Sequence, residues 1–235
     1  TRIYSLVVDE RGNIIIAATT AERQITVYYS EDGGNSFVST TIIPEQAPIS
    51  PRLSVREDGS CFLFVTFEDE AKDSLEIYYT LLEPFMLVRT QVLPVSFDRF
   101  VTEPELSFNF LPSHTTLGAT DYVVFQARIL GEEYGYQLYC KRSSDRGLTW
   151  SQALHVSSFN EEFEGSITGP ELFENQRPFI THIDGELYLA WERRYIYQSQ
   201  IYFARLSGTG AIIEWERLTE PSYSSLYPEI IFYDD

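Results

Sequence analysis

The chain consists of short runs in which apolar and polar residues alternate, a pattern typical of strands that bury one face. Four such runs read alike and come before a turn: residues 25–30, 75–80, 136–140 and 199–203. A second set precedes them, and three of its members follow a Gly-containing turn: residues 13–18, 61–67, 122–126 and 186–191. A third set of shorter runs comes earlier still: residues 3–8, 53–55, 106–110 and 179–182. The repetition predicts units of consecutive antiparallel strands.

A fourth strand closes two of the units, at residues 37–43 and 150–156. Four antiparallel strands per unit, repeated radially, are the blade of a β-propeller. We therefore predict an all-β fold, a β-propeller of four-stranded antiparallel blades, with four complete blades and the first strand of a fifth. The prediction is one domain over residues 1–235, with blades at about 1–47, 48–98, 99–158 and 175–221, and another blade beginning in 222–235.

Propellers close with four to eight blades, so a fifth, single strand leaves two interpretations open. Either the chain is part of a larger propeller of the six-bladed type, or two chains complete one ring. An incomplete ring exposes strand edges and apolar blade faces. Self-association through such edges is therefore one predicted interaction.

Two turns, 113 residues apart, share the phrase S-x-D-x-G-x-[ST]-[FW]. Its members are Ser30, Asp32, Gly34 and Phe37 in the first turn, and Ser143, Asp145, Gly147 and Trp150 in the second. The aspartate is suited to accept backbone N–H groups of its own turn, and the glycine to adopt a positive φ. The aromatic residue then begins the return strand, where it is expected to pack between neighbouring sheets.

This phrase resembles the Asp-box of the BNR repeat family, which occurs in sialidases and related β-propellers. The resemblance implies that both turns lie at the periphery of the blades, with a structural rather than a catalytic role. It also implies an extracellular or cell-envelope location, although the given residues hold no leader of the signal-peptide type.

The composition narrows the possible partners. The net charge of −18 and the pI near 4.5 argue against binding of nucleic acid through a broad basic face. No apolar run approaches the ~20 residues that span a bilayer, so no membrane insertion is expected. The histidines and acidic clusters match no ligand spacing, so neither a metal nor another cofactor is predicted. Cys61 and Cys140 fall within apolar strand patterns, which favours buried free thiols, while a disulfide stays open.

Charged residues stand where the first strand of each unit begins, and loops at that point meet ligands in propellers. The candidates for ligand binding at these positions and at the ends of the second strands are Arg2, Arg52, Glu105, Arg177, Glu68 and Glu192. Gln126 occupies a place equivalent to that of Glu192. In the predicted register these side chains converge on one axis.

The resemblance to sialidases implies a specific chemistry for some of these positions. Sialidases bind a carboxylate with three arginines, which Arg2, Arg52 and Arg177 could supply, because guanidinium groups match carboxylates bidentately. They also use a tyrosine nucleophile polarised by a glutamate, for which Tyr227 and Glu229 are the catalytic candidates. The phrase Thr1-Arg2-Ile3-Tyr4 departs from the family signature, which has Pro at the place of Tyr4. The structural alternative is that these arginines and glutamates pair with one another.

Two classes of function follow. One is a recognition module that binds a glycan or a protein, with no assignable reaction. The other is a glycoside hydrolase of the exo-sialidase type, or a fragment of one.

Overall fold

Contacts in the computed structural model group the chain into two compact units, Thr1–Thr102 and Glu103–Asp235, and each is described by itself. The structure describes residues 4–42, 48–69, 74–83, 92–93, 97–131, 135–163, 166–195, 198–220 and 223–231. Regular structure in these residues is strand, apart from one 3-10 turn, η1 (Pro170–Leu172). No helix among them has the length and hydropathy that a membrane crossing requires.

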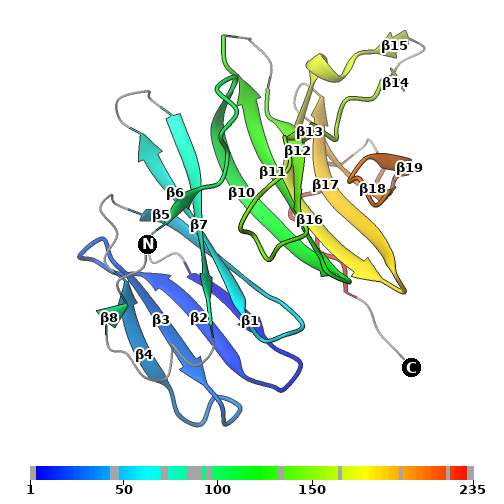
Figure 1. The fold of residues 1–235 in the computed structure, drawn as a ribbon. Helices are drawn as coiled ribbons and strands as arrows, with labels where there is room; N and C mark the ends of the chain where they lie inside the picture. Colours follow the sequence, from blue (N-terminus) through cyan, green and yellow to red (C-terminus); the bar gives the residue numbers. More distant parts are fainter. Residues whose placement is uncertain are drawn as a thin grey trace. The chain divides into compact units, whose positions relative to one another are not determined.

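The first unit holds two sheets (Figure 1). The strands of one, in spatial order, are β1 (Tyr4–Val8), β2 (Ile14–Thr19), β3 (Ile25–Ser30), β4 (Val38–Ile42) and β8 (Val92–Leu93). The strands of the other are β5 (Pro48–Val55), β6 (Cys61–Asp69), β7 (Ser74–Leu82) and β9 (Asp98–Arg99). All neighbours pair antiparallel except β4 and β8.

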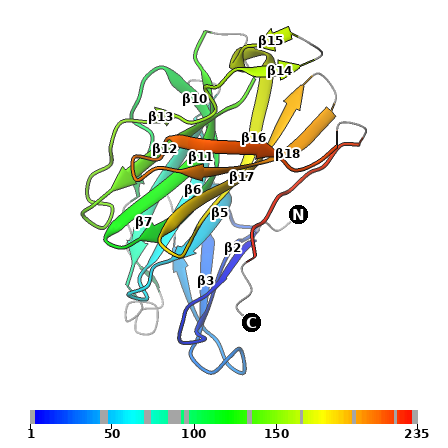
Figure 2. The same ribbon diagram turned by 90° about the vertical axis from the view of Figure 1, so that its right-hand side faces the viewer.

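The second unit holds two larger sheets and a small hairpin (Figures 1 and 2). One sheet consists of β10 (Leu106–Leu117), β11 (Thr120–Ile129), β12 (Gln137–Ser143) and β13 (Leu154–His155). The other consists of β16 (Phe173–Ile183), β17 (Glu186–Tyr195), β18 (Gln198–Leu206) and β19 (Ile212–Arg217). The hairpin is made of β14 (Glu161–Phe163) and β15 (Ser166–Thr168). All of these pairings are antiparallel.

Alternation along each strand decides which face is buried, because successive side chains point to opposite faces. In the first unit, Ile15 and Val27 form a core with Leu63 and Val65 of the neighbouring sheet. Each of these side chains is at most 1% exposed. The second unit has a core of the same kind, between the sheet that contains β11 and the sheet that contains β17. The predicted all-β architecture of four-stranded antiparallel sheets is confirmed, and β8 adds a fifth, parallel strand to the first sheet.

One face of the first unit's first sheet exposes apolar side chains to solvent. On β1, which lies at the edge of its sheet, Tyr4, Leu6 and Val8 are 68%, 52% and 53% exposed. Self-association through such a surface stays a prediction, as do the single domain and the blade boundaries.

The strand expected in residues 222–235 is absent from their described part. Residues 223–231 form no strand, and Tyr227 has a φ of 59°, which lies in the left-handed region. A regular strand residue has a negative φ, so a continuous ladder does not pass through Tyr227. Hydrogen bonds to β18 and to a side chain of β17 hold this segment instead of a ladder. The apolar residues that suggested a strand, such as Leu226 and Ile231, are more than half exposed.

Strands β11 and β17 also run further than predicted, and β16 begins six residues earlier. Most of their additional residues are polar, and buried polar ones such as Glu192 and Arg193 have hydrogen-bond partners. Asn175, for example, is fully buried and accepts a bond from the indole of Trp191. A hydrophobic pattern cannot reveal a strand whose buried positions are polar and paired.

Candidate functional site

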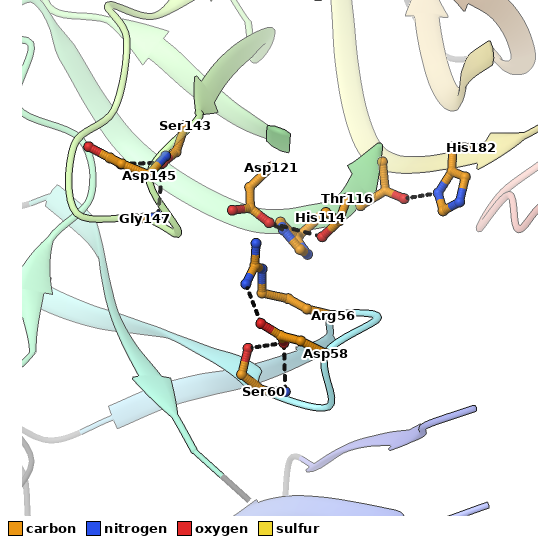
Figure 3. Close-up of polar contacts among 11 residues, drawn as sticks. Arg56, Asp58, Ser60, His114, Thr116, Asp121, Ser143, Asp145, Gly147 and His182 are labelled. Atoms are coloured by element: carbon orange, nitrogen blue, oxygen red, sulfur yellow. Dashed lines mark hydrogen bonds and ion pairs between the residues drawn. The ribbon is translucent and has the colours of Figure 1, made fainter. Parts of the chain in front are cut away.

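The second aspartate turn forms a closed set of hydrogen bonds, shown in part in Figure 3. Ser143 Oγ donates to Asp145 Oδ1 over 2.7 Å and accepts the N–H of Gly147 over 2.8 Å. Thr149 donates its N–H and its hydroxyl to the same carboxylate, over 2.9 and 2.6 Å. The hydrogen bonds from Thr149 and Ser143 lower the pKa of Asp145 to about 2.

The first turn repeats this geometry at Ser30, Asp32, Gly34 and Ser36. Hydrogen bonds from Ser36 and Ser30 lower the pKa of Asp32 to about 2. Gly34 and Gly147 have φ values of 91° and 80°, which glycine adopts without strain. Phe37 departs from the expected packing, because it remains 42% exposed, whereas Trp150 is half-buried. In both turns the aspartate binds its own loop, an arrangement that suits a structural role.

The predicted site residues do not all enter one arrangement. Arg2 lies outside the described residues. Arg52 on β5 and Glu68 on β6 belong to the first unit, and both are exposed. In the second unit, Glu105 and Glu229 are exposed, and their carboxylates form no ion pair with any described residue.

Three of the predicted residues do come together in the second unit. Arg177 Nη1 donates to Glu192 Oε2 over 2.5 Å, and the side chain of Glu192 is only 3% exposed. The N–H of Tyr227 donates to the other oxygen, Glu192 Oε1, over 2.6 Å. The Arg177 guanidinium carbon lies 4.5 Å from the centre of the Tyr227 ring, in cation–π geometry. With Gln126, which holds the backbone of Arg177, these residues are called the Glu192 site below.

The backbone is irregular at Arg177. The pairing of β16 with β17 shifts register between Gln176 and Phe179, so a bulge interrupts the ladder there. Arg177 has a φ of 51°, in the left-handed region, and its N–H donates to Gln126 Oε1 over 3.0 Å. Gln126 lies on β11 and is 3% exposed. A left-handed arginine costs about 1 kcal/mol, and such strain clusters at functional sites.

The chemistry available at this site is hydrogen bonding and ion pairing around a single carboxylate. Arg177 is 31% exposed and carries further N–H donors, while Glu192 is shielded. In the described part of the chain, no three His, Cys, Asp or Glu side chains are close enough together to hold a metal ion. Cys61 and Cys140 are buried and free, and burial raises the pKa of each thiol to about 12.

A second charged group lies on the opposite face of β17, and the sequence did not predict it. Arg193 Nε donates to Glu161 Oε2 over 3.1 Å, and the hydroxyl of Tyr202 donates to Glu161 Oε1 over 2.5 Å. The guanidinium carbon lies 4.2 Å from the ring centre of Phe159 and 3.9 Å from that of Phe173. These five residues are called the Arg193 cluster below.

Burial dominates the electrostatics of the Arg193 cluster. It lowers the pKa of Arg193 to about 10, and it raises the pKa of Tyr202 together with the hydrogen bond to Glu161. One signal in the sequence could have revealed the arginine. Leu187, Leu189 and Trp191 alternate on the core face, and the next position of that series is Arg193.

No family model and no curated protein matches the chain. Solved structures do match it. An α-L-arabinanase of Penicillium chrysogenum, complexed with arabinobiose, has a TM-score of 0.66 at 11% identity, over 94% of this chain and 67% of its own. An α-L-arabinofuranosidase of Fusarium graminearum, in complex with an iminosugar inhibitor, has a TM-score of 0.64 at 10% identity, over 94% and 67%. A thermostable family-43 glycoside hydrolase has a TM-score of 0.57 at 14% identity, over 95% and 73%. At such identities the likeness shows the fold alone, and that fold is the β-propeller of these glycoside hydrolases.

Proposed function

We propose that the protein is a glycan-recognition propeller and that the Glu192 site in its second unit binds the sugar. The observation that carries the proposal is the Arg177–Glu192 pair. It joins an arginine with a left-handed backbone, whose side chain is 31% exposed, to a carboxylate that is only 3% exposed. A purely structural ion pair needs neither the strained backbone nor an accessible guanidinium.

The residue types suit a sugar. Hydroxyl groups of a glycan accept hydrogen bonds from a guanidinium and donate them to a carboxylate. Because the site rests on β11, β16 and β17, rigid strands hold most of these groups in place.

The first ligand to test is an arabino-oligosaccharide. The matching solved structures include an arabinanase complexed with arabinobiose, and this supports the choice of ligand. An extracellular or cell-envelope location, and membership of the Asp-box propellers, remain parts of the proposal that rest on the two aspartate turns.

The second candidate function is glycoside hydrolysis, which is favoured by the enzymes among the matching structures. Glycosidases of most families need two carboxyl groups that flank the scissile bond. The Glu192 site provides one carboxylate, which is already paired with Arg177. It also provides one arginine, whereas the sialidase interpretation requires three. Recognition is therefore the better-supported function.

A titration of arabinobiose by calorimetry tests the proposal, with reducing-sugar release from arabinan measured in parallel. We expect binding without hydrolysis, and at least tenfold weaker binding by Arg177→Ala. Arg205→Ala, a change on an exposed position of β18, is the matched control and keeps the affinity of the unmodified protein. Equal affinities of the Arg177 and Arg205 variants would disprove the site, and sugar release that depends on Glu192 would favour the hydrolase.

A further inference from the structure

The segment that follows β19 lies across the proposed site. Residues 223–231 of this segment are called the strap below, and their path is visible in Figure 2. We infer that the strap is an autoinhibitory element, which closes the Glu192 site until a glycan displaces it. This inference concerns the regulation of the site and rests on the proposed function for the identity of the ligand.

The strap is attached at its beginning to the first residues of β18. The N–H of Ser225 donates to the carbonyl of Ser199 over 2.8 Å. Gln200 Nε2 donates to the carbonyl of Tyr223 over 2.8 Å. These bonds hold the strap beside the sheet and fix where Tyr227 arrives.

Tyr227 then occupies both ligand-binding features of the site. Its N–H donates to Glu192 Oε1 over 2.6 Å and so takes the place of a donating sugar hydroxyl. Its ring covers the Arg177 guanidinium. Since Arg177 fills the other oxygen, both oxygens of the carboxylate are engaged by the protein itself. A glycan therefore gains access to Glu192 only if Tyr227 leaves.

The strap has the properties of an element that can detach. Leu226, Tyr227 and Ile231 are 52%, 70% and 83% exposed, so detachment uncovers little additional apolar surface of the strap itself. Tyr227 also has a φ of 59°, an unfavourable conformation for a residue with a side chain. Segments with few buried apolar contacts open at low free-energy cost. Opening releases the strained backbone and costs the hydrogen bond to Glu192 and the cation–π contact with Arg177.

Chemical labelling of Glu192 measures whether the strap is closed. A carbodiimide couples glycine ethyl ester to accessible carboxylates, and mass spectrometry of the Glu192 peptide gives the labelling rate. The test variant is Tyr227→Pro, because proline has no N–H and cannot adopt a positive φ. This variant removes the hydrogen bond from the backbone N–H of residue 227 to the Glu192 carboxylate. We therefore expect Glu192 to be modified about tenfold faster than in the unmodified protein. Tyr227→Gly keeps the N–H and tolerates the φ, so its modification should rise by less than the proline variant's.

Ile231→Ala is the matched control within the strap, because Ile231 is exposed, and its labelling rate should equal that of the unmodified protein. Far-ultraviolet circular dichroism verifies that each variant folds. If Tyr227→Pro does not fold, amide hydrogen exchange on the unmodified protein replaces it, and addition of arabinobiose should then remove the protection of the Tyr227 amide.

The outcomes separate this inference from the proposed function. If Glu192 is labelled faster in Tyr227→Pro and arabinobiose slows that labelling again, the result supports both the closing strap and the glycan-binding function. Faster labelling that arabinobiose leaves unchanged supports the closing contact and argues against the glycan as ligand. Labelling of Glu192 at the same rate in Tyr227→Pro, Ile231→Ala and the unmodified protein would overturn the strap.

Discussion

Glu192 and Arg193 are neighbours on one strand, and each forms part of an arginine–glutamate–tyrosine group on its own face of β17. In the Arg193 cluster, the side chains of Arg193 and Glu161 are 0% and 7% exposed. Aromatic rings of Phe159 and Phe173 cover the guanidinium there. In the Glu192 site the carboxylate is shielded, but its arginine is 31% exposed.

The difference shows that residue types alone do not distinguish a structural ion pair from a binding site. The Arg193 cluster satisfies its groups with one another and ties the start of β14 to the sheet that contains β17 and β18. The Glu192 site instead combines a strained backbone at Arg177 with a hydrogen bond from the N–H of Tyr227, a residue that is 70% exposed. Access of solvent to the arginine is the physical property that separates the two.

The largest effect is expected for Arg193→Ala. Removal of the arginine leaves Glu161 buried without its cation, which lowers the free energy of unfolding by about 3–5 kcal/mol. Urea denaturation followed by tryptophan fluorescence measures this loss. A decrease in the free energy of unfolding below about 1 kcal/mol, typical of a surface ion pair, would mean that solvent reaches the Arg193 cluster.

A smaller loss is expected for Arg177→Ala. Glu192 then keeps the Tyr227 N–H but loses its cation, and solvent reaches the position of Arg177. We expect the free energy of unfolding to fall by about 1–2 kcal/mol in the same urea experiment. A loss as large as that of Arg193→Ala would remove the contrast between the two groups.

The pH dependence near His155 sharpens the comparison. Burial, and then the charge of Arg193, lower the pKa of His155 in the folded protein. The unfolded chain therefore binds this proton more readily, so stability is fully present above about pH 6.5 and falls as the pH decreases below it. His155→Gln should weaken that dependence between pH 7.5 and pH 5.0, measured as the shift in urea midpoint. An identical shift of the urea midpoint in the unmodified protein and in His155→Gln would show that protonation of His155 does not contribute to the pH dependence.

The smallest effect is expected for Arg205→Ala on the open face of β18. Arg205 pairs with Glu214 over 2.7 Å and Glu186 over 3.3 Å, and all three side chains are at least 33% exposed. Exposed pairs of this kind change the free energy of unfolding by at most about 0.5–1 kcal/mol. This variant gives the baseline of the series, and a loss exceeding that of Arg177→Ala would invalidate burial of the paired carboxylate as the principle that orders the two.

The strand alternation predicted the sheets well, since β3 and most of β6 coincide with runs read from the sequence. It failed at residues 223–231, where apolar residues suggest a strand although no sheet partner is present among the described residues. A strand forms only where a neighbouring strand is in place to accept and donate its backbone hydrogen bonds. The local pattern of apolar residues does not reveal whether such a neighbour exists.

The site was predicted in part. Arg177, Glu192 and Tyr227 were all candidates, but Tyr227 was expected to act through its hydroxyl with Glu229 as partner. The structure places its backbone N–H on Glu192 instead. The bulge at Arg177 and the contribution of Gln126 arise from pairing between strands, which the sequence does not display.

Arginine modification by phenylglyoxal, with and without arabinobiose, tests the central contrast in one measurement. Peptide mass spectrometry follows Arg177 and Arg193 separately in the unmodified, folded protein. We predict that Arg177 reacts and is protected by arabinobiose, whereas Arg193 does not react under either condition. Equal reaction of the two arginines, or reaction of Arg177 that arabinobiose leaves unchanged, would contradict the account.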